Sequence, residues 1–186
     1  MRRVVTGLDA AGRSVVVSDA DEPPVRTPLM PGAEWQQLWE DDAPRLGASP
    51  TAGPTAYFPP PGGVRFGTFT LPPASSAASP DAAAPADPDG AEAEADMDAL
   101  LPGLRATLTG TPSGRHATAT VDFEVVLSGE VTLELPDGSR MHLRAGDTVV
   151  QNGALHRWVN TGDVPAVIGL VMLGLAPRPA AAGPAG

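Results

Sequence analysis

Residues 121–160 read VDFEVVLSGEVTLELPDGSRMHLRAGDTVVQNGALHRWVN, and this stretch decides the fold. Short apolar and β-branched runs alternate in it with the turn signals SG, PDG, AGD and NG. Another turn, TGD, and a last apolar run, AVIGLVMLG, follow directly. Turns at intervals of about eight to ten residues indicate short antiparallel strands that close into a compact sandwich or barrel.

The chain before this stretch also predicts short strands, together with one helix. The runs RRVVTG and RSVVVSD, separated by LDAAG, predict an N-terminal hairpin, and residues 64–71 predict a further strand. Trp35 and Trp39, four residues apart, share a face in a helix and also in a strand, so the spacing leaves this segment unassigned. The run DMDALLPGLRATL predicts one short helix with Asp96 as its N-cap.

Turn-forming residues and a low-complexity segment divide the chain into four parts. The 21 Gly and 22 Pro residues make up close to a quarter of the 186 residues, which disfavours a helical bundle. Residues 72–95, PPASSAASPDAAAPADPDGAEAEA, have almost nothing to bury. The predicted parts are N-terminal strands that join the barrel or a dimer (1–71), a flexible loop (72–95), the core (96–175) and a disordered tail (176–186).

Charge and composition narrow the classes of partner. The net charge is −10, with twelve Arg and no Lys, so the basic face that nucleic acids or anionic membranes require is not expected. The chain has no Cys, which excludes disulfides, a thiolate nucleophile and a zinc–thiolate site. Neither a signal-peptide core nor an apolar run of membrane-spanning length is present, so we expect a cytoplasmic protein.

Two groups of Gly, His and polar residues occur at defined spacings in the C-terminal half. The first reads Gly110, five residues, His116-Ala-Thr118, three residues, Asp122, six residues, Gly129. The second reads Asn152-Gly153, two residues, His156, three residues, Asn160. These spacings resemble the two signatures of the cupin family over roughly residues 110–175. The resemblance implies an all-β fold, a double-stranded β-helix of the jelly-roll type.

Cupins that bind a metal usually hold it with four side chains, and the resemblance assigns each of these ligands to a position in this chain. In this chain those positions hold His116, Thr118, Asp122 and His156. Thr is a poor ligand where the family has a second His, and Asp is shorter than the usual Glu. Two His and one carboxylate remain a sensible set for Fe(II), Mn(II), Ni(II) or Zn(II). The sequence therefore leaves open one divalent metal held by His116, Asp122 and His156, or none.

Strand alternation predicts which side chains share the barrel interior. With a period of two, His116, Thr118, Thr120, Asp122 and Glu124 face inward. The apolar outer face of this strand is expected to pack against other strands. Asp122 and Glu124 would then stand about 6.5–7 Å apart, close enough to raise each other's pKa in a cavity.

The second motif and neighbouring strands complete the expected site. His156 and Trp158 share a face, and Gln151 points inward from the preceding strand. We expect Asp122 or Glu124 to be the base and His156 its acid partner. Substrate would contact Arg65, Thr118, Thr120, Gln151 and Trp158. Alternatively, Asp122 and His156 form only an internal hydrogen-bonded pair, and Trp158 belongs to the core.

Three functions remain open from the sequence. The first is a metal-free acid–base enzyme that cyclises, dehydrates, isomerises or decarboxylates a hydrophobic, carbonyl-containing small molecule; the resemblance suggests a polyketide-like natural product. The second is a metal-dependent cupin such as an Fe(II) dioxygenase. The third is a non-catalytic module that binds a small ligand. The resemblance also implies a homodimer that pairs through N-terminal strands, because the predicted hairpin has an edge to cover.

Overall fold

The computed structural model describes residues 1–46, 56–75, 90–110 and 114–176. Most of the predicted flexible loop and nearly all of the predicted tail, residues 76–89 and 177–186, lie outside the described residues. The described elements are β1 (Arg2–Leu8), β2 (Ser14–Asp21), β3 (Glu34–Asp41), β4 (Val64–Leu71), α1 (Gly90–Leu100), α2 (Leu104–Thr109), β5 (Thr120–Ser128), β6 (Glu130–Glu134), β7 (Arg140–Arg144), β8 (Thr148–Asn152), β9 (Arg157–Val159) and β10 (Ala166–Gly174).

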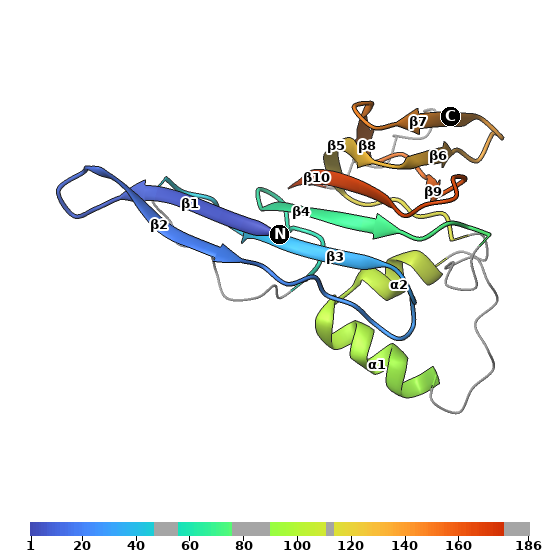
Figure 1. Cartoon of the computed structure of the whole chain (residues 1–186), viewed down its shortest axis with the longest axis horizontal. Coiled ribbons are helices and arrows are strands. Elements are labelled where there is room, and N and C mark those ends of the chain that lie inside the picture. Colours follow the sequence, from blue (N-terminus) through green and yellow to red (C-terminus); the bar gives the residue numbers. More distant parts are fainter. Residues whose placement is uncertain (47–55, 76–89, 111–113, 177–186) are drawn as a thin grey trace, which may run out of the picture.

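Two antiparallel sheets face each other and form the barrel (Figure 1). The larger sheet has the strand order β3-β4-β10-β5-β8, and the smaller one has the order β7-β6-β9. Val126 and Ile168 from the larger sheet pack with Val131 from the smaller one, and all three are almost completely buried. The predicted all-β jelly roll is therefore confirmed, and β4 begins and ends at the predicted residues.

The segment around the two tryptophans is strand β3, and the expectation that both share a face is wrong. The register with β4 shifts between Gln37 and Trp39, so one extra residue is inserted there. Such a bulge reverses the alternation of side chains beyond it. Trp35 is consequently buried in the interior, whereas Trp39 pairs with Phe66 on the outer face.

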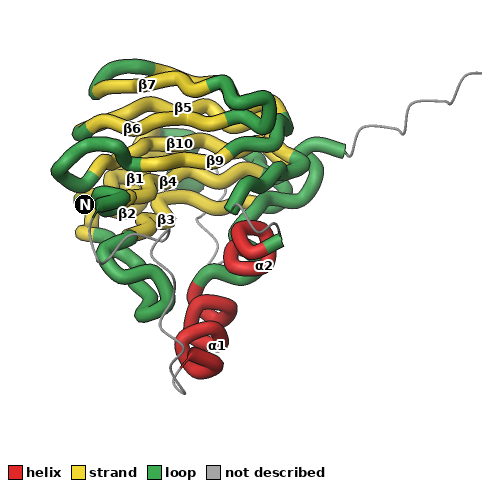
Figure 2. Tube along the Cα trace, turned by 90° about the vertical axis from the view of Figure 1, so that its right-hand side faces the viewer, coloured by secondary structure: helices red, strands yellow, loops and turns green. Residues whose placement is uncertain are grey.

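Two helices, rather than the single predicted one, cover one end of the barrel, below the larger sheet in Figures 1 and 2. Helix α1 begins at Gly90, so residues 90–95 are helical and not part of a flexible loop. Asp96 lies inside α1 and not at its N-cap. Gly103, with φ of 87°, interrupts the helical path before α2. No described helix is long and apolar enough to cross a membrane.

The helices complete the larger of two hydrophobic clusters. Met97, Leu101 and Leu104 are almost fully buried against Trp35 and the end of β10. The apolar residues of α1 and α2 thus close the barrel on one side. The N-terminal hairpin β1–β2 is a separate two-stranded sheet that projects away from the barrel (Figure 1).

Candidate functional site

A cavity of about 390 Å³ opens between the sheets and the two helices. This volume lies in the range of pockets that hold small organic ligands. Most of its wall is apolar, with contributions from both helices and both sheets. The polar side chains on its wall include Tyr57, His116, Thr118, Asp122, Glu124 and His156. The cavity therefore suits a largely apolar molecule with a few polar atoms.

Strand β5 supplies the two carboxylates of the cavity. Asp122 and Glu124 are each 7% exposed and lie on the inward face, as the alternation predicts. Oδ1 of Asp122 and Oε2 of Glu124 are buried and have no hydrogen-bond partner among the described residues. A buried acceptor without a partner costs about 1–3 kcal/mol. Each carboxyl thus has hydrogen-bonding capacity that the described protein does not use, and both residues line the cavity.

Burial raises the pKa of both carboxyl groups, but by different amounts. It raises the pKa of Asp122 to about 6, while a hydrogen bond from the Thr120 hydroxyl opposes the rise. It raises the pKa of Glu124 to about 8, with further help from the negative charge of Asp122. Near pH 7 Asp122 is thus mainly ionised and Glu124 mainly protonated. Two residues apart on one strand, one carboxyl can thus accept a proton and the other can donate one.

The two histidines face each other across an isolated β-bridge. The ring centroids of His116 and His156 are 4.5 Å apart. Nδ1 of His156 lies 2.8 Å from the carbonyl oxygen of Ala154. Because a carbonyl oxygen only accepts, Nδ1 carries the proton and Nε2 carries the lone pair. The neutral His156 ring therefore offers an acceptor at Nε2.

Burial also lowers the pKa of both imidazoles. The pKa of His156 falls to about 4, chiefly because burial disfavours the charged ring, with His116 adding repulsion. The imidazolium form is therefore scarce at neutral pH, which does not suit the acid role expected for His156. No hydrogen bond joins His156 to Asp122 in the described structure, so the two do not form the internal pair that was the alternative. Glu124 is the better proton donor.

The side chains that the resemblance implies as metal ligands, His116, Asp122 and His156, do not come together around one point. Chemically, two imidazoles and one carboxylate suit a divalent transition metal. Among the described residues, however, no three His, Asp or Glu side chains come close enough together to hold a metal ion. The two imidazoles lie against each other, and Thr118 occupies the fourth family position. The arrangement fits the metal poorly.

The residues expected to contact substrate divide into two groups. Thr118 and Trp158 line the cavity. Thr120 is buried, and its hydroxyl lies 2.6 Å from that of Thr118 and donates to Asp122, so it positions the carboxylate. Gln151 is buried opposite Asp122 and does not line the cavity. Direct substrate contacts by Thr120 and Gln151 are therefore not supported.

Arg65 does not belong to the cavity, contrary to expectation. It faces inward from β4, but its guanidinium lies 2.6 Å from Asp42 and donates to the carbonyl oxygen of Ala56. Only 4% of Arg65 is exposed. It fastens the segment before β4 to the barrel. Strand alternation correctly predicts that the Arg65 side chain points inward. It does not predict which part of the interior the side chain reaches, and so the expected substrate contact was wrong.

The sequence pattern missed several polar residues that line the cavity: Tyr57, Glu94, Arg105, Thr109 and Arg157. Of these, Tyr57 interacts electrostatically with both carboxyls of β5. It lies in a segment without strand or helix periodicity, held by a hydrogen bond from its backbone N–H to Pro102. Tyr57 is 9% exposed and lines the cavity. Burial raises its pKa far above the ordinary value, and the charges of Asp122 and Glu124 add to the rise. It is thus a protonated phenol in electrostatic contact with both carboxyls.

Comparison with known proteins agrees with this architecture. Residues 107–173 match the family model described as the Cupin domain. The chain is similar to the Oryzines biosynthesis cluster protein J of Aspergillus oryzae, with 47% identity over 45 residues, which is 24% of this chain and 25% of that protein. It is also similar to the cupin-domain-containing oxidoreductase srdB of Neurospora crassa, with 39% identity over 54 residues, 29% of this chain and 28% of that protein.

The matches to both relatives therefore span only about a quarter of each protein. Among solved structures, the chain is similar to a predicted oxalate decarboxylase from Thermotoga maritima. That alignment covers 87% of this chain and 100% of the other, with 19% sequence identity and a TM-score of 0.46.

Proposed function

We propose that the barrel, whose residues 107–173 match the Cupin domain, holds the active site of a metal-free acid–base enzyme. The observation that carries the proposal is the pair of buried carboxyls with unpartnered oxygens, Asp122 and Glu124, whose pKa values stand at about 6 and about 8. A pair of titratable groups pushed apart in this way assigns a base and an acid.

The chemistry that fits this pair is proton transfer next to a carbonyl group. The Asp122 carboxylate removes a proton from the carbon beside the carbonyl, and the Glu124 carboxyl gives its proton to the carbonyl oxygen. The product is an enol. When the enol carbon attacks a second carbonyl of the same molecule and closes a ring, the enol hydroxyl returns its proton to Glu124 and Asp122 gives its proton to the new alkoxide. Dehydration then removes a proton from the neighbouring carbon to Asp122, while Glu124 protonates the departing hydroxyl, which leaves as water. Isomerisation needs only return of the proton to another carbon.

The substrate class follows from the cavity wall. Aromatic and aliphatic side chains from the helices and from Phe58, Phe69 and Trp158 surround the carboxyls, so the bound molecule is hydrophobic and carries at least one ketone. Neutral His156 accepts a hydrogen bond from a hydroxyl of this molecule at Nε2. Similarity to a biosynthesis cluster protein supports a biosynthetic intermediate as the substrate, and we propose that this intermediate is polyketide-like.

The first test uses a simple hydrophobic ketone, 2-tetralone, in D₂O. We expect the protein to accelerate exchange of the protons beside the carbonyl, followed by NMR, by at least about a hundredfold over buffer. The rate should be highest between about pH 6 and about pH 8, where Asp122 is ionised and Glu124 protonated. Binding of the ketone without exchange would identify a ligand-binding module, and exchange abolished by a chelator would contradict the metal-free mechanism.

Tyr57→Phe tests the role of the tyrosine hydroxyl. Removing only the phenol oxygen takes away a hydrogen-bond donor on the wall that also holds Asp122 and Glu124. We expect the exchange rate at saturating ketone to fall about tenfold, the value of one hydrogen bond. The affinity for the ketone should stay within a factor of two or so, since the ring remains. A reduced affinity with an unchanged rate would assign Tyr57 to packing alone.

A further inference from the structure

Two hydroxyls and one carboxyl at the start of β5 form a chain of hydrogen bonds. The hydroxyl oxygens of Thr118 and Thr120 lie 2.6 Å apart, which is hydrogen-bonding distance. The Thr120 hydroxyl in turn hydrogen-bonds to the carboxyl of Asp122. Thr118 and Asp122 line the cavity, whereas Thr120 is 3% exposed and does not. Two residues of the cavity wall are thus linked through a buried hydroxyl.

The number of hydrogens fixes the direction of this chain. Near pH 7 Asp122 is mainly ionised, so its oxygens only accept hydrogen bonds. The single hydroxyl hydrogen of Thr120 then points at the carboxylate. Only the hydroxyl hydrogen of Thr118 remains for the contact between the two threonines, so Thr118 donates to Thr120. Because both hydrogens are used inside the protein, the Thr118 oxygen can only accept a hydrogen bond from a ligand.

His156 presents the same polarity to the cavity from the neighbouring segment. Its Nδ1 donates to the carbonyl oxygen of Ala154, so Nε2 carries a lone pair. The segment of Thr118 runs beside that of His156, because His116 and His156 form the isolated β-bridge. The carbonyl oxygen of Thr118 also lies 3.5 Å from the place that a Cβ on Gly153 would occupy. This part of the wall therefore holds two acceptors, one hydroxyl oxygen and one imidazole nitrogen.

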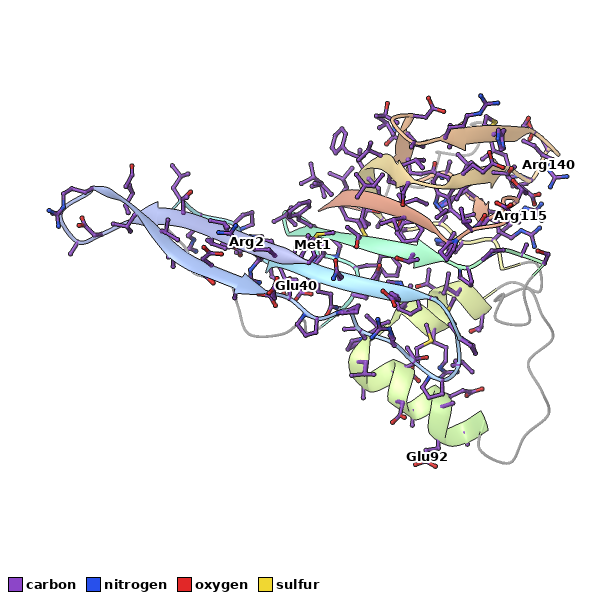
Figure 3. All side chains as sticks on the ribbon, in the orientation of Figure 1. Met1, Arg2, Glu40, Glu92, Arg115 and Arg140 are labelled. Carbon is purple, nitrogen blue, oxygen red and sulfur yellow. The ribbon has the colours of Figure 1, made fainter. Side chains whose placement is uncertain are left out.

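The guanidinium groups at this end of the barrel are engaged by one carboxylate. Figure 3 shows Arg115 and Arg140 there, away from the hairpin, and both pair with Glu134. Arg157 lines the cavity, and its Nε and Nη2 donate to the same carboxylate. Glu134 thus occupies the place beside these cations that an anionic ligand group would take. An anionic group would also meet only lone pairs at the two acceptors, so the matching ligand group is a neutral donor.

We propose that the substrate is a hydroxylated ketone, and that Thr118 accepts the hydrogen of its hydroxyl group in a subsite to which His156 adds a second acceptor. The inference rests on the proposed function, because it takes the bound molecule to be a hydrophobic ketone. A ligand hydroxyl brings the hydrogen that this contact requires. A carbonyl or ether oxygen at the same place would set one lone pair against another.

The order of residues along the chain places this hydroxyl relative to the ketone. Asp122 and Glu124, the proposed base and acid, are about 6.5–7 Å apart along β5. Thr118 and Thr120 come before Asp122, and β5 is extended from Thr120 onward. The acceptor and the acid therefore lie on opposite sides of the base. The hydroxyl is accordingly attached to the part of the molecule beyond the carbon that loses its proton.

Matched ligands test the subsite by equilibrium binding. Calorimetry compares 2-tetralone with 6-hydroxy-2-tetralone and 6-methoxy-2-tetralone, at about pH 7, where Asp122 is ionised. In these compounds the second ring carries no substituent, a hydroxyl or its methyl ether. We expect the hydroxyl compound to bind about tenfold more tightly than 2-tetralone, the value of one hydrogen bond. The methyl ether should bind no more tightly than 2-tetralone.

Substitution of Thr118 locates the acceptor. In Thr118→Val, 6-hydroxy-2-tetralone should bind no more than about twofold more tightly than 2-tetralone, because the oxygen is gone. Thr118→Ser keeps the hydroxyl and should restore the preference. Thr107→Val is the matched control, since the Thr107 hydroxyl also donates to a carbonyl oxygen, that of Gly103, but does not line the cavity. It should keep the full preference, and thermal unfolding checks that each variant is folded.

Three results would each overturn the proposal. The hydroxyl compound could bind no more tightly than 2-tetralone, the methyl ether could bind as tightly as the hydroxyl compound, or the preference could survive Thr118→Val. Calorimetry requires no proton exchange, so the subsite and the acid–base mechanism fail separately. Preference for the hydroxyl compound without exchange would support the subsite and contradict the enzyme, and exchange without the preference would do the reverse.

Discussion

Asp122→Asn should reduce ketone exchange about a thousandfold, the usual contribution of a positioned general base. The amide keeps the size of the side chain but cannot accept a proton at neutral pH. The fold should survive, because the variant removes a buried carboxylate whose charged form is disfavoured. NMR exchange rates, with thermal unfolding as the check of structure, measure both effects.

The base assignment of Asp122 can be separated from a general effect of lost charge. Asp163→Asn removes one carboxylate from an exposed turn and should leave exchange unchanged. Asp122→Glu restores the carboxylate on a longer side chain and should recover part of the rate. If Asp122→Asn kept full activity, or if the Glu variant were no better than the Asn variant, the carboxylate of Asp122 would not be the base.

Much of this site follows from alternation along a single strand. Thr120, Asp122 and Glu124 share a face because alternate residues of a strand point the same way, and the structure makes that face the interior. The expected reason, packing of the apolar outer face against other strands, is wrong, since Phe123 on that face is 48% exposed. The motif spacings supplied His116 and His156. Acidity could not be predicted in the same way, since it depends on how completely the helices and sheets exclude water. Burial keeps Glu124 protonated and His156 neutral near pH 7, so Glu124 and not His156 can donate a proton.

Other errors have local physical causes. A single inserted residue in β3 placed Trp35 and Trp39 on opposite faces, and four-residue spacing cannot reveal a bulge. The Ala- and Glu-rich run at residues 90–95 resembles the low-complexity segment before it, yet Ala and Glu are strong helix formers. Tyr57 reaches the cavity through an irregular segment, where periodicity carries no information about direction.

Glu124→Gln should stabilise the protein at alkaline pH and flatten its pH dependence. The folded pKa of about 8 lies above the ordinary value of 4.5, so folding favours the protonated form. The contribution of Glu124 to stability is therefore complete below about pH 4.5 and is lost as the pH rises through about 8. A shift of this size corresponds to a loss of about 5 kcal/mol, which the neutral amide avoids.

Urea unfolding at a series of pH values from about 5 to about 9 measures the free energy of unfolding of both proteins. The wild-type chain should lose stability up to about pH 8 and then level off, while Glu124→Gln should lose much less, since Asp122, with a pKa of about 6, is then the only titrating carboxyl of the cavity. The lowered pKa values of His116 and His156 act in the opposite direction below about pH 6.5 and are common to both proteins. Glu92→Gln, at an exposed position in the first turn of α1, should leave the wild-type profile unchanged. Identical profiles for wild type and Glu124→Gln would mean that Glu124 is not held protonated, and the proposed acid would lose its physical basis.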